Sequence, residues 1–166
     1  MRLDLLDILV CPDCADQPRL DLAVDTQDGP EILTGRLTCP ACRRMFSIDR
    51  GVPRFVVDAE NYSENFAYEW NRWGRVQIDR FAGHSLSARR FLADSRWPES
   101  WIKDKLILDA GCGAGRFADV AAGMGARVVA IDLSGAVDAA RANTVDRDGR
   151  VHVVQASLFR LPFRRG

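Results

Sequence analysis

The sequence predicts an α/β protein in which a small β-rich module precedes the beginning of a parallel sheet. Three observations support this prediction. Two C-x-x-C pairs lie within the first 57 residues, among short alternating apolar runs that are typical of strands. From Leu106 onward, apolar runs alternate with alanine-rich segments, as they do in parallel sheets with crossover helices. A glycine-rich run separates the first of these apolar runs from the segment that follows.

Composition and charge narrow the class of protein. The 166 residues have room for one ordinary domain, or for a small module and part of another. An apolar fraction of 47% with 28% charged residues is typical of a globular protein and excludes a disordered chain. Lys and Arg number 23 and Asp and Glu also 23, so no overall field attracts nucleic acid or an anionic membrane.

The first residues of the sequence are not expected to act as a secretory signal. Arg2, Asp4 and Asp7 interrupt its apolar residues, which excludes the core of a secretory signal. No stretch reaches the roughly 18 to 20 apolar residues of a membrane span. We therefore expect a cytoplasmic protein. Cysteines rarely form disulfides in that reducing compartment, so their spacing points to metal binding or catalysis first.

Residues 1–57 are expected to form the first module. The alternating runs Ile32–Leu37 and Met45–Ile48 predict strands, and turn signals stand at 28–30 (Asp-Gly-Pro) and 49–51 (Asp-Arg-Gly). The chain between the two C-x-x-C pairs is long enough for a β-hairpin that returns the second pair to the first. A module of this size needs an additional stabilising element.

The cysteine spacing predicts a structural metal site. Each C-x-x-C turn can direct two thiolates at one ion, and two such turns complete a closed tetrahedral Zn²⁺ site with no open position. Zinc would then contribute much of the module's folding free energy. A redox pair, a disulfide and buried thiols are the alternatives. The predicted ligands are Cys11, Cys14, Cys39 and Cys42.

Two further runs carry a resemblance to a known family. Leu5–Pro12 and Met45–Pro53 resemble the small zinc-ribbon proteins that activate tRNA, rRNA and release-factor methyltransferases, over residues 3–56. The resemblance implies that the module stabilises a methyltransferase partner and covers its apolar surface, here within the same chain. It also implies that the module does not bind the cofactor itself.

Residues 58–103 are expected to be a linker followed by a helical cover. Aromatic residues recur at loosely helical spacing, among them Tyr68, Trp70, Phe81 and Phe91.

Residues 104–166 predict three strands and two helices. The strands are 106–108, 127–131 and 151–154, and the helices are 116–124 and a segment from Ser134, as N-cap, to about Asn143. This order predicts an incomplete Rossmann-like parallel sheet consisting of its first three strands. We expect its open edge to mean either a fragment, truncated within the domain, or a chain completed by self-association or by a partner chain.

The glycine run has the spacing G-x-G-x-G, formed by Gly111, Gly113 and Gly115, and follows Asp109. A dinucleotide loop would require glycine at position 116, where arginine stands. The run is similar to the first motif of class I S-adenosylmethionine-dependent methyltransferases. That resemblance implies that Asp109 holds the α-amino group of the cofactor above the glycines. It also implies that Asp132, at the end of the second strand, accepts both ribose hydroxyls. The alternative role for each acid is to cap the following helix.

Other parts of the resemblance are less complete. Related enzymes often carry an acid after the third strand to bind adenine; here Ser157 or the backbone amide of Leu158 would take that role. Cys112 is expected to fill space beside the cofactor rather than to act as a nucleophile. The aromatic run Phe66–Trp73 resembles a lid over the cofactor pocket, with packing between the modules as the alternative.

Two functions follow from these patterns. The first is the N-terminal portion of an S-adenosylmethionine-dependent methyltransferase, weakly active or inactive as given, with S-adenosylmethionine and structural Zn²⁺ as cofactors. The alternative is a zinc-dependent activator or binding protein that docks on a methyltransferase or translation-related partner. Nucleic-acid binding through the module is disfavoured, because its basic residues are not concentrated. The methyl acceptor, whether small molecule, sugar, RNA or protein, and the catalytic residues stay unassigned.

Overall fold

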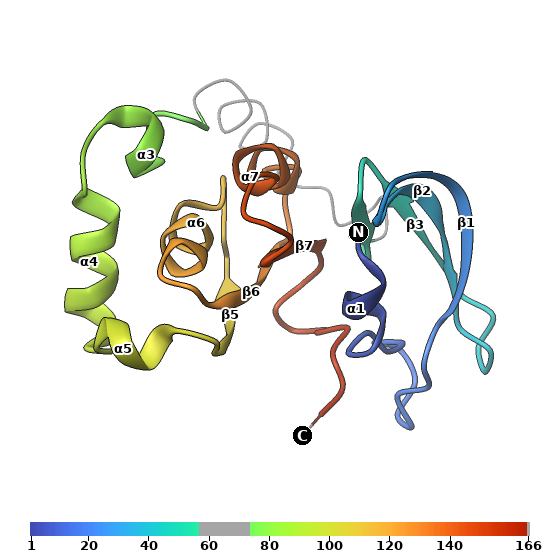
Figure 1. The fold of residues 1–166 in the computed structure, drawn as a ribbon. Coiled ribbons are helices and arrows are strands. Elements are labelled where there is room, and N and C mark those ends of the chain that lie inside the picture. Colours follow the sequence, from blue (N-terminus) through green and yellow to red (C-terminus); the bar gives the residue numbers. More distant parts are fainter. Residues whose placement is uncertain (57–73, 166) are drawn as a thin grey trace.

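The computed structural model describes residues 1–56 and 74–165, and these form one seven-stranded sheet flanked by helices (Figure 1). The strands are β1 (Asp21–Asp28), β2 (Glu31–Thr38), β3 (Met45–Asp49), β4 (Val52–Arg54), β5 (Leu106–Ala110), β6 (Arg127–Asp132) and β7 (Val151–Gln155). The helices are α1 (Leu3–Leu6), α3 (Asp79–Ala82), α4 (Leu86–Ser95), α5 (Glu99–Ile102), α6 (Arg116–Gly123) and α7 (Val137–Thr144).

The strand order is β1-β2-β3-β4-β7-β6-β5. Strands β1 to β4 pair with one another in antiparallel fashion, whereas β5, β6 and β7 pair in parallel. This confirms the predicted α/β fold, a β-rich module followed by three Rossmann-like parallel strands. The two parts are joined by a short parallel pairing of β4 with β7, in which Arg54 lies opposite Gln155 and the amide of Phe55 donates to the Gln155 carbonyl at 2.7 Å.

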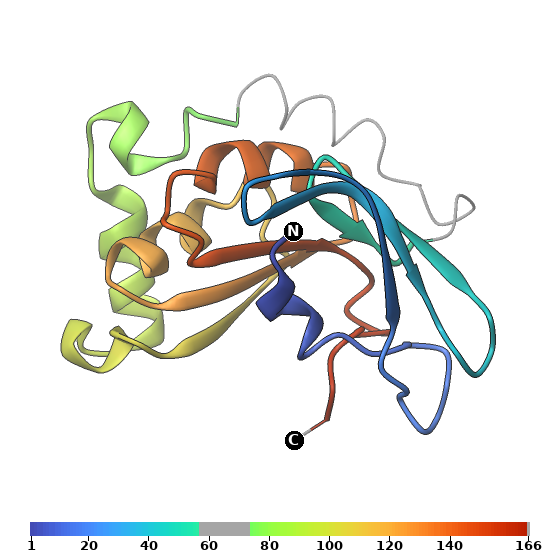
Figure 2. The same cartoon turned by 45° about the vertical axis from the view of Figure 1, so that its right-hand side comes forward.

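Strands β6 and β7 are buried on both faces, as their unbroken apolar runs require. On β6, Val128 and Ala130 pack with α6 and α7 in one core. The alternate residues, Val129 and Ile131, belong to a second core made mainly by the N-terminal module. Figure 2 shows β5, β6 and β7 side by side with this module against them. The module therefore covers one apolar face of the sheet, as the resemblance implied.

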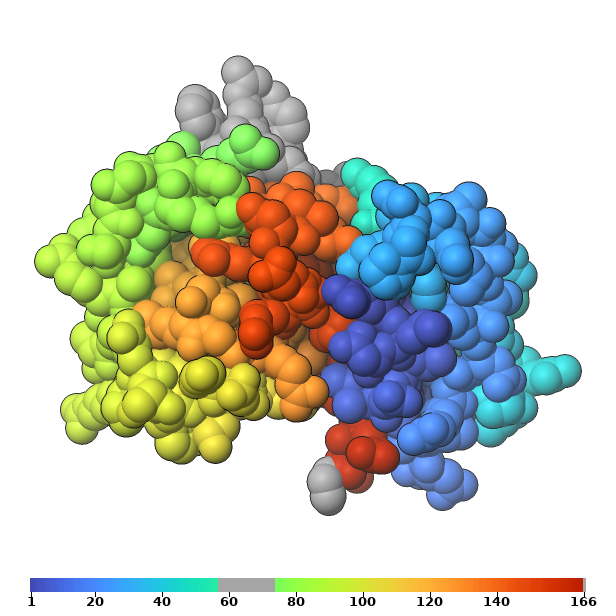
Figure 3. All heavy atoms as spheres, viewed as in Figure 1, coloured from blue at the N-terminus to red at the C-terminus, as the bar shows by residue number. Residues whose placement is uncertain are grey.

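The segment after β7 strengthens this contact. The amide of Val10 donates to the Pro162 carbonyl at 2.9 Å, and the amide of Arg164 donates to the Ile8 carbonyl at 3.0 Å. In Figure 3 the first residues of the chain lie directly against these last residues. The two ends of the described chain thus form one surface.

The turns of the module follow their sequence signals. Gly29 connects β1 to β2 with φ of +52°, and Arg50 and Gly51 connect β3 to β4 with φ of +50° and +78°. Two successive residues with positive φ are typical of the tight type I′ hairpin turn. The β1–β2 hairpin returns the second cysteine pair to the first, as expected.

Helices α3 to α5 lie on the outer side of α6 (Figure 1). The Asp79 carboxylate accepts hydrogen bonds from the amides of Ser87 and Ala88, both at 2.9 Å, and so caps the start of α4. Arg80 donates to Asp119 of α6 at 3.0 Å and so connects α3 to α6. The predicted linker and aromatic run fall mainly at 58–73, outside the described residues.

Strand β5 lies at the end of the sheet, and this corrects one expectation. The sequence predicts a buried strand at 106–108, but Leu106 and Leu108 are 54% and 46% exposed and only Ile107 is buried. The reason is that Leu106 and Leu108 lie on the same face of the sheet as Val129, and the core that the N-terminal module forms over that face does not include them. Cavities of about 150 and 260 Å³ adjoin the strand.

Candidate cofactor site and metal centre

The glycine loop connects β5 to α6 with three positive φ angles, +80°, +52° and +84° at Gly111, Gly113 and Gly115. A β-carbon at Gly111 would meet open space, whereas one at Gly115 would lie 3.2 Å from the Cα and Cβ atoms of Ala140. Gly111 and Gly115 therefore have different structural roles. Gly115 lets α6 approach α7 closely, and Gly111 keeps the surface of the loop free for a ligand.

Asp109 is the chemically unusual residue of this loop. Its Oδ2 atom is buried and has no hydrogen-bond partner among the described residues. Burial raises the pKa of this carboxyl to about 6, the negative charge of Asp132 adds to the increase, and the backbone amide of Ala118 opposes it. A buried carboxylate oxygen without a partner is costly. A cation such as an α-amino group would remove that cost, so the site fits the amino acid part of S-adenosylmethionine.

We expect Asp109→Asn to stabilise the donor-free protein at neutral pH. The carboxyl pKa is higher in the folded chain than its ordinary value of 3.8, so between about pH 4 and 6 the folded state binds the extra proton. Stability therefore falls as pH rises through this window. Urea unfolding should show this fall for the wild type and not for the neutral variant, which should gain about 2 kcal/mol at pH 7.5. Parallel stability curves for the two proteins would contradict the assignment.

Asp132 lies at the end of β6, on the same edge of the sheet. Its Oδ2 accepts a hydrogen bond from the Gly113 amide at 2.9 Å, and its Oδ1 accepts from both the amide and the hydroxyl of Ser134 at 2.8 Å. One carboxylate thus joins the glycine loop to the turn after β6. A carboxylate can accept about four hydrogen bonds, so capacity for a ribose hydroxyl remains.

The turn after β6 corrects a detail of the sequence prediction. Ser134 is not the N-cap of α7, which begins at Val137 after Ala136. Instead the Ser134 hydroxyl accepts from the Ala136 amide at 3.2 Å while it donates to Asp132. The residue organises the turn that carries the acid. Sequence spacing alone did not separate these two roles.

Ser157 and Leu158 follow β7, near the same edge. The Ser157 hydroxyl accepts from the amide of Phe159 at 3.2 Å, which closes a local turn. Leu158 is half exposed. The structure therefore places both predicted adenine-site residues after the third strand, and their role stays a prediction. Cys112 is buried within the loop, where its thiol donates to the Gly113 carbonyl at 3.6 Å.

The four predicted metal ligands converge in the N-terminal module. Their sulfur atoms all lie within 4.8 Å of one another; the Sγ atoms of Cys11 and Cys42 are 3.7 Å apart and those of Cys14 and Cys39 are 3.8 Å apart. Tetrahedral zinc with Zn–S bonds of about 2.3 Å requires sulfur separations of about 3.8 Å. The cluster therefore has the dimensions of a zinc site.

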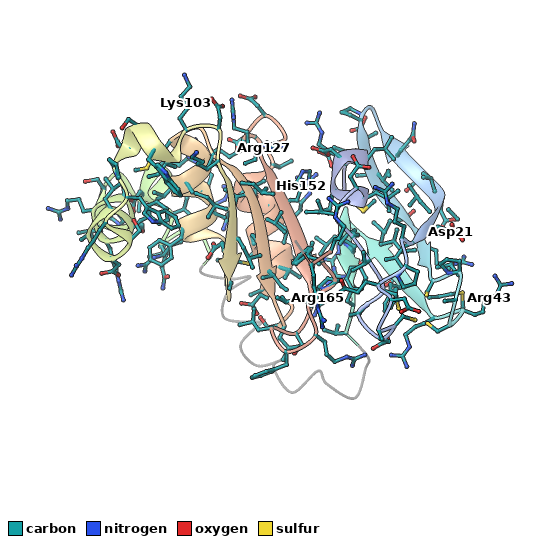
Figure 4. The ribbon with its side chains drawn as sticks, turned by 90° about the horizontal axis from the view of Figure 1, so that it is seen from below. Asp21, Arg43, Lys103, Arg127, His152 and Arg165 are labelled. Atoms are coloured by element: carbon teal, nitrogen blue, oxygen red, sulfur yellow. The ribbon has the colours of Figure 1, made fainter. Side chains whose placement is uncertain are left out.

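Backbone geometry supports this site. The Cys42 amide donates to the Sγ atom of Cys39 at 3.4 Å, as expected of a knuckle that stabilises a thiolate. Burial raises the pKa of Cys39, but hydrogen bonds from the amides of Cys42 and Ala41 outweigh it and bring the pKa to about 7. Arg43, beside Cys42, lies at the outer end of the module in Figure 4, away from the parallel strands. The second cysteine pair therefore lies on the side of the module away from the parallel strands.

Two groups of side-chain contacts between distant elements had no signal in the sequence. Arg54 donates to Gln155, 101 positions later, at 2.8 Å. Arg147 forms a two-bond pair with Asp119, at 2.7 Å for each bond, and Arg80 joins the same carboxylate. Neither pair has a motif, because each depends on how distant elements pack.

The fold and the loop together define an α/β domain built to bind a nucleotide-like cofactor, preceded by a four-thiolate module. Family comparison names both parts. Residues 107–166 match the family described as methyltransferase domain, and residues 2–51 match the family described as Trm112p-like protein. The chain thus combines a Trm112p-like zinc-ribbon domain with a methyltransferase domain.

Three solved structures are similar to this chain. Protein arginine methyltransferase 10 of Arabidopsis thaliana is 24% identical, with a TM-score of 0.41, over 56% of this chain and 26% of its own. Phosphoethanolamine N-methyltransferase 1 of Haemonchus contortus, solved with phosphoethanolamine and S-adenosylhomocysteine, is 18% identical, with a TM-score of 0.40, over 58% and 22%. A TehB-like SAM-dependent methyltransferase of Corynebacterium glutamicum is 29% identical, with a TM-score of 0.38, over 58% and 46%.

The matches cover less than half of each of these three structures. No curated protein sequence matches the chain. Within residues 1–56 and 74–165, no helix is both long and apolar enough to span a membrane.

Proposed function

We propose that the chain is the donor-binding, N-terminal portion of an S-adenosylmethionine-dependent methyltransferase, stabilised in cis by its zinc ribbon. The buried Oδ2 atom of Asp109, which has no partner among the described residues, carries this proposal. It lies at the glycine loop, where the position of a Gly111 side chain is open space. A cationic amino group bound there would pair with the carboxylate. The matching family over residues 107–166 supports the same function.

In this proposal the residues of the chain bind and orient the donor. Asp109 holds the α-amino group, and Asp132 accepts hydrogen bonds from the ribose while it keeps the loop and the following turn together. When bound, S-adenosylmethionine supplies an activated methyl group, so positioning rather than covalent help from the protein provides much of the rate. Ser157 and Leu158 are proposed to flank the adenine.

The zinc ribbon is proposed to have a structural role. Zn²⁺ held by the four cysteines would fix the two knuckles that precede the strands of the module. Residues 1–57 would then act as a permanent cover for the parallel sheet, residues 58–103 as linker and lid, and residues 104–166 as the donor-binding part. Core contacts of the module with Val129, Ile131 and Val154 support this division of labour.

Calorimetric titration with S-adenosylhomocysteine tests the function. We expect saturable binding by the zinc-loaded wild type and at least tenfold weaker binding by Gly111→Ala, whose methyl group would enter the ligand space. Gly83→Ala is the matched control, because Gly83 also has positive φ, +69°, and open space around a β-carbon. An alanine at this position would be under comparable backbone strain, but Gly83 lies at the end of α3 rather than in the glycine loop. A folded wild type that binds nothing would contradict the proposal and favour the activator alternative.

A further inference from the structure

One arginine of the zinc ribbon, Arg54, is linked to both ends of the turn that follows Asp132. It contacts one end directly and reaches the other through Gln155. Arg54, at the end of β4, donates from Nη2 to Oδ1 of Asp138 at 2.7 Å and from Nη1 to Oε1 of Gln155 at 2.8 Å. Gln155 then donates from Nε2 to the Leu133 carbonyl at 3.0 Å. Leu133 comes directly after Asp132, and Asp138 lies in the first turn of α7. The guanidinium therefore connects the ribbon with the beginning and the end of residues 133–138.

The contacts are placed where they can hold the turn firmly. Gln155 is only 4% exposed, and the side chains of Arg54 and Asp138 are 16% and 18% exposed. Hydrogen bonds with a charged partner in such partly buried surroundings are shorter and stronger than neutral ones. Asp138 also lies near the N-terminus of α7, where the helix dipole favours a negative charge.

The backbone of Asp132, the acid proposed to bind the ribose, is held by the end of β7. Asp132 lies opposite Gln155 in the β6–β7 register, and the amide of Ala156 donates to the Asp132 carbonyl at 3.0 Å. Beyond it, the Asp132 carboxylate accepts from the amides of Gly113 and Ser134. A displacement of the Leu133 carbonyl would therefore disturb the carboxylate that the ribose must meet.

We infer that Arg54 is a positioning residue for the donor site, through which the zinc ribbon sets the affinity for S-adenosylmethionine. The inference rests on the proposed function. Arg54 does not touch the donor; it holds the 133–138 turn, by way of Gln155 and Asp138, in the conformation that orients Asp132. Binding groups that are held in place before the ligand arrives lose less conformational entropy on binding.

Arg50 offers a matched control. It donates to Asp138 at 3.0 Å and to Asp49 at 3.3 Å, two carboxylates that Arg54 also contacts, but it has no contact with Gln155 among the described residues. Its side chain is 68% exposed. Arg50→Met thus removes a positive charge from the same cluster and leaves the connection to Leu133 intact.

The test compares S-adenosylhomocysteine affinity in zinc-loaded proteins. We expect Arg54→Met to raise the Kd about tenfold and Arg50→Met to change it less than twofold, because exposed ion pairs contribute little. Gln155→Leu should reproduce the effect of Arg54→Met. The double variant Arg54→Met, Gln155→Leu should bind no more weakly than Arg54→Met alone, since Arg54→Met already breaks the connection that runs through Gln155. Arg54→Lys should recover only part of the affinity, because a lysine cannot make the two divergent bonds.

A second measurement separates positioning from folding. In the donor-free protein, hydrogen exchange at the Gly113 and Ser134 amides should be faster in Arg54→Met than in Arg50→Met, with equal zinc content. Wild-type affinity and exchange in both Arg54→Met and Gln155→Leu would overturn the inference. Failure of the wild type itself to bind would instead overturn the proposed function, and the two results cannot be confused.

Discussion

Removal of zinc is expected to unfold residues 1–56 and to abolish binding of S-adenosylhomocysteine. Zinc contributes about 10 to 16 kcal/mol to the folding of small zinc domains, which exceeds the stability of most domains of this size. Cys39→Ser should have the same effect, because Cys39 is fully buried and its sulfur accepts the Cys42 amide. The unfolding should extend to the donor site, since the module packs against Val129 and Ile131 of β6.

Thermal unfolding followed by circular dichroism, with zinc content measured on the same samples, checks this expectation. Cys112→Ser is the matched control, because Cys112 is buried but lies in the glycine loop, outside the cluster. It should retain one zinc per chain and the fold of the module. If the zinc-free protein or Cys39→Ser kept a melting temperature within a few degrees of the wild type, zinc would not be the stabilising element.

Asp132→Ala is expected to weaken S-adenosylhomocysteine binding more than a hundredfold at pH 7. The substitution removes the proposed acceptor of the ribose hydroxyls. It also leaves the amides of Gly113 and Ser134 without the carboxylate that they bind in this structure. The lost hydrogen bond from a ribose hydroxyl to the charged carboxylate, at about 1.5 to 3 kcal/mol, together with the two loop amides left unpaired, accounts for a loss of this size.

Asp25→Ala controls for the loss of one negative charge, because Asp25 is an exposed residue of the outer strand β1. Calorimetry should give this variant the affinity of the wild type. An Asp132→Ala protein that folds and binds within threefold of the wild type would contradict the proposed role of Asp132 toward the ribose.

The sequence was sufficient for the features that arise locally. Apolar runs and alanine-rich segments predicted β5 to β7 with α6 and α7 to within a few residues, because parallel strands and their crossover helices have distinct periodicities. The C-x-x-C spacing predicted the convergence of four sulfur atoms. Asp109 lies near the end of β5 and the glycines lie in the turn before α6, where the sequence predicted them. Their roles toward a donor are still predictions.

Features that depend on packing between distant elements were not predicted. No local pattern indicates that β4 pairs with β7, so the single sheet and the Arg54–Gln155 bond had no signal. The exposure of Leu106 and Leu108 also follows from the position of β5 in the sheet rather than from its apolar character. His152, which Figure 4 shows where β7 faces the module, bonds Asp4 at 3.2 Å across the same junction. Only the assembled fold creates such contacts.

The N-terminal module covers the parallel sheet as part of the same polypeptide, so its binding to the sheet does not depend on protein concentration. Two separate chains that bury one another's apolar surfaces come apart on dilution below their dissociation constant. Here Val129, Ile131 and Val154 meet the ribbon intramolecularly, at an effective concentration set by the connecting chain. The stoichiometry is fixed at one to one, and neither half depends on matched synthesis of the other. The melting temperature should accordingly be independent of protein concentration.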